Sequence, residues 1–141
     1  MNPSPTDDPL DLVHQVVHRV RTHQRQALRD QAELSPMDAR VLGYFGRHPG
    51  STLKDLAEHS GRDKAQLARL IKGLRESGWL RAQTDPEDRR NQRLWLTEAG
   101  EALHQRMAGA MREVSRRAVQ GLTVEQHRVL VELLGRVRDN L

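Results

Sequence analysis

The sequence has 141 residues, no cysteine and a formal net charge of +4. Its length fits one domain with a core of its own, and the lack of thiols excludes disulfides, thiolate metal sites and cysteine redox sensing. No apolar run is long enough to cross a membrane, and the first residues lack the apolar block of a secretory signal, so we expect a cytoplasmic protein.

The positive charge is concentrated in one quarter of the sequence. Residues 61–95 contain nine arginines and lysines against five acids, so the whole formal excess of +4 lies there. A local basic surface of this kind is typical of a protein that binds a polyanion such as nucleic acid. A solvated, arginine-rich surface is the alternative, and charge alone does not separate the two.

The first predicted helix begins near residue 8. Residues 1–7 are rich in proline and polar residues, which predicts a disordered start. Asp8 then offers a helix cap with Pro9 at the first helical position, and apolar residues recur at helical spacing to about residue 31. A helix of this length covers more than one small domain needs, so we expect part of its apolar stripe to meet another chain.

Three helix-start signals follow in short order. Ser35 is a cap, Thr52 opens a capping box, and residues 63–66 have the same form as that box. Each signal precedes a short segment with apolar residues at helical spacing, and Gly61 separates the second segment from the third. Two short capped helices joined by a tight turn with glycine predict a helix-turn-helix.

A β-hairpin is expected next. Residues 79–83 and 92–96 can pair as strands around a polar turn that begins at Asp85. Alternation gives the pair one apolar face, as a half-buried hairpin requires, made of Leu80, Ala82, Leu94 and Leu96. Trp95 falls on the opposite face, where it either packs against a neighbouring helix or lines a cleft.

Two further helices complete the predicted fold. Thr97 caps a helix that runs to about residue 120, and Thr123 opens a capping box before the last one. The terminal helices carry too much apolar surface for a small domain and fit a dimerisation bundle. The predicted fold is mainly α with a small β-hairpin wing: a winged helix-turn-helix at residues 35–97, with helical dimerisation segments at 8–34 and 98–141.

Three runs, in this order, resemble the MarR family of bacterial transcription regulators: Arg69-Leu70-Ile71 with Gly78-Trp79-Leu80, then Asp85-Pro86-Glu87-Asp88-Arg89-Arg90, then Leu96-Thr97-Glu98-Ala99-Gly100. In element order the resemblance extends from about residue 8 to the end. It implies an obligate homodimer of winged-helix subunits that binds pseudo-palindromic double-stranded DNA, usually as a repressor. It also implies release by a small aromatic or phenolic ligand held between the dimerisation and DNA-binding parts.

The resemblance implies a set of DNA-facing residues on the recognition helix: Lys64, Ala65, Gln66 and Arg69. It assigns the minor-groove arginine of the wing tip to Arg90 and the acid that supports the wing to Asp88. Lys72 joins the set as an outward residue of the same helix, and Arg89 as a neighbour at the hairpin tip. The side chains at two of these positions suit base recognition, because an arginine can donate two hydrogen bonds to guanine and a glutamine can pair with adenine. For both wing arginines, pairing within the chain is the competing interpretation.

Two residues depart from the family's pattern. The family often has an arginine at the position of Ala82, paired with the aspartate at 88, so Asp88 needs another partner here. Gly73 lies inside the recognition helix, where glycine costs roughly 1 kcal/mol relative to alanine.

The sequence leaves two alternatives to a DNA-binding regulator released by an organic ligand. Asp11, His14 and His18 share one face of the first helix and could gather around a divalent ion, which would make a metal-responsive regulator of the same fold. A winged helix used only for protein contacts is a further alternative. The sequence contains no nucleophile elbow, no paired carboxylates and no HExxH motif, so neither an enzyme nor a cofactor is predicted.

Overall fold

The computed structural model describes residues 8–31 and 34–141, and the predicted disordered start lies outside them. Within the described residues the chain forms six helices and one two-stranded antiparallel hairpin. In chain order they are α1 (Pro9–Ala27), α2 (Pro36–Arg47), α3 (Leu53–Ser60), α4 (Lys64–Glu76), β1 (Leu80–Thr84), β2 (Gln92–Leu96), α5 (Glu98–Ala118) and α6 (Val124–Asp139). The predicted fold class is confirmed.

Two element boundaries differ from the prediction. Helix α1 ends at Ala27 rather than near residue 31, because Leu28 turns into the core, where it is 7% exposed. Strand β1 begins at Leu80 rather than at residue 79, because the N–H of Trp79 donates to the carbonyl of Leu74 and closes the end of α4.

The predicted caps are confirmed, with one difference in form. Ser35, Thr52 and Thr123 each form a capping box in which the third helical residue returns a bond to the cap. Asp63 caps α4 in another way: its carboxylate accepts the N–H of Ala65, at the second helical position, at 3.2 Å. The box predicted for residues 63–66 is therefore wrong, although the helix begins where expected.

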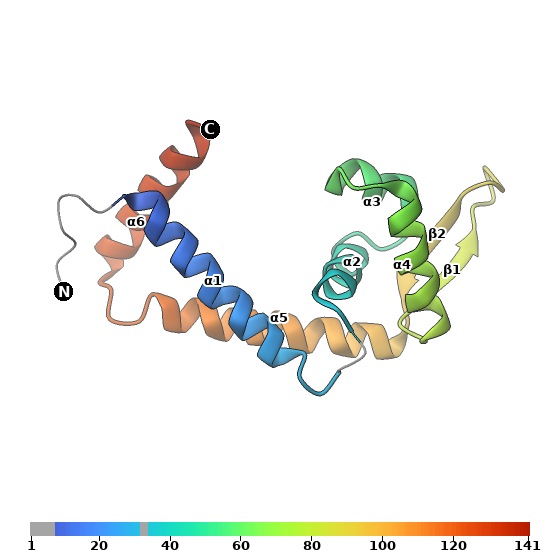
Figure 1. The fold of residues 1–141 in the computed structure, drawn as a ribbon, viewed down its shortest axis with the longest axis horizontal. Coiled ribbons are helices and arrows are strands. Elements are labelled where there is room, and N and C mark those ends of the chain that lie inside the picture. The colour runs from blue at the N-terminus through green and yellow to red at the C-terminus, as the bar shows by residue number, and fades with distance from the viewer. Residues whose placement is uncertain (1–7, 32–33) are drawn as a thin grey trace.

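Helix α5 is the axis of the molecule (Figure 1). α1 crosses over it and α6 folds back near its C-terminal end, whereas α2, α3, α4 and the hairpin gather at the other end. The most deeply buried large side chains belong to α2 and α4: Phe45, Leu42, Leu67 and Val41. The core thus lies inside the helix-turn-helix and its wing, and α5 joins this unit to the α1 and α6 end.

The hairpin places the four predicted apolar residues opposite one another in two pairs. Leu80 pairs with Leu96 and Ala82 with Leu94, and the three leucines are buried. Ser51, from the loop that follows α2, pairs with Leu94 on the outer side of β2. The wing is therefore attached along one edge to the chain between α2 and α3, which fixes where the hairpin leaves the body.

Gly73 offers a direct test of the helix propensity of α4. A Cβ added there would meet nothing within 4 Å, and its backbone is helical, so Gly73→Ala is expected to stabilise the fold by about 1 kcal/mol. Urea unfolding measures this change. Gly78→Ala is the matched control: it also has open space but lies at φ +83°, where alanine is strained, so it should destabilise. A loss of stability in Gly73→Ala would contradict the account.

Candidate nucleic-acid interface

Helix α4 presents its polar face to solvent because its apolar stripe is fixed in the core. Leu67, Ile71 and Leu74 are buried, and these positions recur on one side of the helix. All residues that the sequence assigns to DNA contact are exposed, on this helix and at the wing tip: Lys64, Ala65, Gln66, Arg69, Lys72, Arg89 and Arg90. The structure thus leaves every one of them accessible to a partner.

The cations of α4 are only lightly engaged. Lys72 lies 3.9 Å from Glu76, one turn on, and both side chains are more than two-thirds exposed, so this pair contributes little. Arg75 is exposed and donates to the side-chain oxygen of Gln92 at 3.0 Å. That bond connects the recognition helix to the first residue of β2.

Asp88 organises the tip of the wing and reaches nothing beyond it. Its carboxylate accepts the backbone N–H of Arg90 at 3.1 Å, the Nε–H of the same arginine at 3.2 Å, and the side-chain amide of Asn91 at 3.4 Å. Asp88 therefore has partners although Ala82 offers none. The Arg90 side chain is 91% exposed, so its pairing with Asp88 orients it without removing it from solvent.

A further contact between the wing and the body involves Arg93, in a pair with Asp85 that the sequence analysis missed. Asp85 is buried, at 7% exposure, and its Oδ2 lies 3.3 Å from Nη2 of Arg93. The same guanidinium donates through Nη1 to the carbonyl of Gly50 at 3.3 Å. The available signal was weak: opposite charges at diagonal positions beside a hairpin turn can reach each other.

Trp95 lies on the outer face of the wing and is half-buried. A Cβ on Gly50 would lie 3.3 Å from its indole, and the guanidinium carbon of Arg81 lies 4.9 Å from its ring centroid. Trp95 thus packs on the loop after α2 and under an arginine, and it also borders a shallow depression beside Asp85 and Arg93. The stack covers the outer side of the hairpin beside the Asp85–Arg93 pair.

His14 and His18 of α1 are not gathered with a third possible metal ligand in the part of the chain that the structure describes. His14 and His18 are exposed and, with Gln15 and Arg19, border a shallow depression. Across residues 8–31 and 34–141, no three histidine, aspartate or glutamate side chains come together in a way that could hold a metal ion. The metal-responsive alternative therefore has no assembled ligand set in the described chain.

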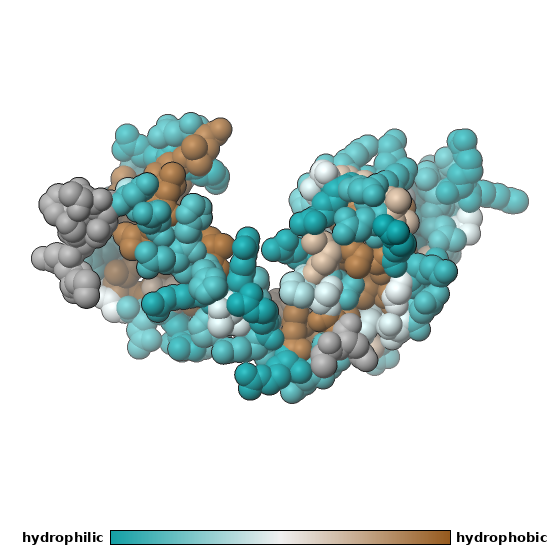
Figure 2. All heavy atoms as spheres, in the orientation of Figure 1, coloured by the Kyte–Doolittle hydropathy of each residue, from teal (hydrophilic) through white to brown (hydrophobic). Residues whose placement is uncertain are grey.

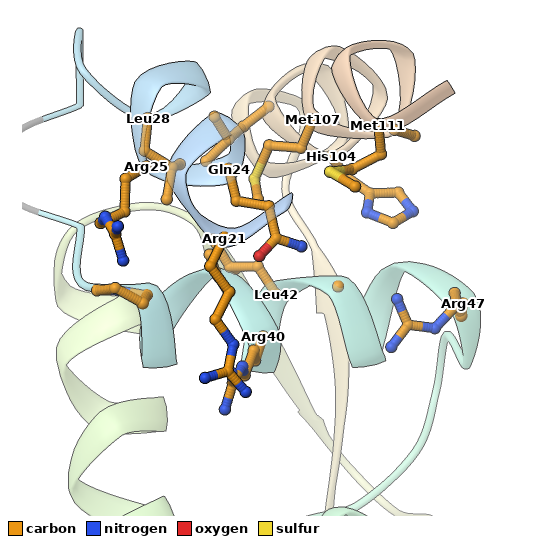
Figure 3. Close-up of a pocket in the computed structure, with 15 residues that line it drawn as sticks. Arg21, Gln24, Arg25, Leu28, Arg40, Leu42, Arg47, His104, Met107 and Met111 are labelled. Carbon is orange, nitrogen blue, oxygen red and sulfur yellow. The ribbon is translucent and has the colours of Figure 1, made fainter. Parts of the chain in front are cut away.

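A cavity of about 370 Å³ lies where α1, α2 and α5 meet (Figure 3). Its apolar wall contains Leu28, Leu42, Leu103, Met107 and Met111. Four arginines border it, two from α1 and two from α2: Arg21, Arg25, Arg40 and Arg47. Figure 3 shows Arg21 and Arg40 extending in the same direction from their two helices, with Arg47 farther along α2. The cavity thus has an apolar wall and positively charged side chains along its rim.

The fold and the exposed basic surfaces define a winged helix-turn-helix protein. Residues 32–91, which span the helix-turn-helix and the hairpin turn, match a model described as the MarR family. The predicted resemblance to that family is confirmed. No helix in the described part of the chain is long and apolar enough to span a membrane.

Solved structures share this fold over nearly the whole chain. A structure of MarR superposes with a TM-score of 0.75 at 21% identity and covers 99% of this chain and 95% of its own. The transcriptional regulator SlyA gives 0.76 at 23%, covering 95% and 94%. A DNA complex of MepR from S. aureus gives 0.77 at 21%, covering 96% and 99%. At these identities the likeness is one of fold.

Proposed function

We propose that this protein is a transcription regulator that binds double-stranded DNA as a homodimer and acts as a repressor. The observation that carries the proposal is the joint exposure of the polar face of α4 and the arginines of the wing tip on one basic unit. The match to the MarR family and the DNA-bound state of MepR support it. A DNA-binding role also fits the expected cytoplasmic location and needs no catalytic group.

The recognition chemistry follows from residue type and position. Arg69 would donate two bonds to a guanine in the major groove, and Gln66 would pair with an adenine. Lys64 stands in the first turn of α4, where free backbone N–H groups also favour a phosphate. Ala65 offers a methyl group to thymine and Lys72 a charge to the backbone. Arg89 and Arg90 would enter a narrow, negative minor groove beside it.

A partner subunit would cover α6 and the outer part of α1. Neither helix has a buried residue among those that the structure describes, and Figure 2 shows hydrophobic residues gathered at the end of the molecule where α6 lies. The apolar side chains of α6 that recur on one face are all more than one-third exposed: Leu130, Leu133, Leu134 and Val137. A contiguous apolar face of this kind is unusual for a monomer and fits a subunit interface.

The opposite face of α6 is satisfied by its own ion pairs. Arg128 donates to both Glu125 and Glu132. The hydrogen bond from the Arg128 guanidinium lowers the pKa of the Glu125 carboxyl. One face of α6 is thus suited to water and the other to a partner. We propose residues 8–34 and 98–141 as the dimerisation region and 35–97 as the DNA-binding domain.

The cavity between α1, α2 and α5 is the proposed effector site. Arginines surround it, so the ligand should be an anion, and the apolar wall calls for an apolar body. Met107 and Met111 favour an aromatic ring, because thioether sulfurs make good contacts with ring edges. A small aromatic acid has these properties. Because the lining comes from both the dimerisation and the DNA-binding parts, such a ligand would change the separation of the two recognition helices.

A charge-matched pair of ligands tests the effector site. 1-Naphthoate is expected to bind the protein and lower its affinity for operator DNA, whereas its uncharged methyl ester should do neither at the same concentration. Arg40→Gln should weaken the effect of the acid, because this arginine lies on the rim. Calorimetry and DNA titration in the presence of each compound measure both effects. Equal binding of acid and ester would refute the anion-binding role.

A mobility shift on random duplex DNA tests the function itself. Binding should weaken steeply as salt rises, because each phosphate contact releases counterions. A winged helix used only for protein contacts would show no shift at low salt.

A further inference from the structure

We infer that the Asp85–Arg93 pair positions the wing tip on DNA and so determines the preference for flanking sequence. The inference rests on the proposed function and adds two residues that do not themselves touch the groove. It assigns Arg93, one of the cations in the basic quarter of the chain, to an internal contact rather than to DNA.

The carboxylate of Asp85 has a defined role on each of its oxygens. Oδ1 accepts the N–H of Glu87 at 3.0 Å and shapes the turn that leads into the tip. Oδ2 faces the guanidinium of Arg93 at 3.3 Å. The backbone N–H of Asp85 donates to the carbonyl of Asn91 at 2.9 Å and closes the base of the loop. A carboxylate buried to this extent needs its cation, since an unpaired buried charge is costly.

Arg93 continues the connection into the body of the domain. Its Nη1 donates to the carbonyl of Gly50, in the loop after α2, while the N–H of Gly50 donates to the carbonyl of Leu94 at 2.9 Å. The N–H of Leu94 in turn donates to Ser51 at 2.9 Å. The base of the wing is thus bound to the loop between α2 and α3. Asp85 connects this base to the tip through its contacts with Arg93 and Glu87.

Nothing else described at the tip performs this role. Asp88 binds only Arg90 and Asn91, which lie in the same loop. Ala82 has no charge to offer it. Arg75 and Gln92 connect α4 to the start of β2, at the other end of the turn from Asp85. The angle at which Arg90 leaves the body therefore depends on Asp85 and Arg93.

The substitution Asp85→Asn separates positioning from charge. Asparagine keeps an oxygen that can accept the N–H of Glu87, but it cannot neutralise Arg93. It also makes the wing more positive, so charge alone predicts tighter binding to any DNA. Glu87→Gln is the matched control, because it makes the same charge change at an exposed site in the same loop, outside the ion pair.

The measurement uses two duplexes with the same half-sites and either AT-rich or GC-rich flanks. Wild type and Glu87→Gln should prefer the AT-rich flanks. Asp85→Asn should lose roughly fivefold or more of that preference, as a lost groove contact would, and should match Arg90→Ala in the ratio of the two affinities. Arg93→Lys should do the same, because lysine lacks the planar fork through which Arg93 reaches Asp85 and Gly50 with two separate nitrogens.

Thermal unfolding shows whether each variant folds. If either Asp85→Asn or Arg93→Lys fails to fold, the ratio of the affinities for the two duplexes is measured with the other variant. Wild-type preference retained in a folded Asp85→Asn or Arg93→Lys protein would overturn the inference. A wild type that binds both duplexes equally would overturn it together with the minor-groove role of Arg90. A wild type that binds neither duplex would instead refute the proposed function.

Discussion

Replacing Arg69 by alanine is expected to weaken binding to a preferred operator by about 1–3 kcal/mol per half-site and to relax the preference at one base position. Arg69 is exposed in the middle of α4, whereas Leu67 and Ile71, two positions before and after it, are buried. Its guanidinium can therefore extend away from the core toward a base edge. The alanine variant keeps the helix, since alanine is the best helix former.

Lys72→Ala is the control for charge. It lies one turn further along α4 and removes one positive charge, but as a phosphate contact it should weaken operator and random DNA alike and reduce the salt slope by about one. Titration of both variants against operator and random duplex separates the two roles. If Arg69→Ala lost equal affinity on both duplexes, the assignment of a base contact to Arg69 would be wrong.

Leu134→Glu is expected to convert the dimer into monomers. The apparent stability of the protein to unfolding should fall as the dimer is lost. In one subunit Leu134 is 47% exposed, so a glutamate there costs the isolated chain little. In the dimer the same carboxylate would be buried without a partner, at a cost of about 3 kcal/mol or more per subunit. Light scattering at micromolar protein measures the mass, and DNA titration should show loss of binding to paired half-sites.

The control for this change is Arg128→Gln, which alters the net charge by the same amount on the opposite, ion-paired face of α6. It should leave the dimer intact. A dimer that persists in Leu134→Glu would show that the apolar face of α6 is not the subunit interface.

The parts of the fold that depend on local sequence were predictable. Ser35 and Thr52 mark helix starts through bonds to residues three positions away, and such bonds form in the same way in any context. The register of the hairpin follows from the alternation of Leu80 and Leu96, because a shift by one residue would expose the whole apolar face. The exposure of Arg69 follows from the periodicity of α4.

The parts that depend on distant segments were not predictable. Arg93 reaches Gly50 across 43 positions of the sequence, and no local pattern indicates which carbonyl a guanidinium will find. The cavity proposed as the effector site forms where α1 crosses α5 beside α2, so its arginine rim could not be seen in the sequence. Asp88 was assigned the support of the wing by resemblance, and the structure adds Arg93, which pairs with Asp85 and reaches the body at the carbonyl of Gly50.

Selection of bound sites from random duplex DNA, with purified protein at moderate salt, tests the central claim most directly. The account predicts enrichment of a pseudo-palindrome with half-sites about 10 bp apart or a multiple of it, since each subunit of the dimer presents one recognition helix. AT-rich sequence should flank the half-sites, where the wing tips lie. Recovery of unenriched sequence, or of single half-sites without a fixed spacing, would contradict a dimeric, sequence-reading regulator.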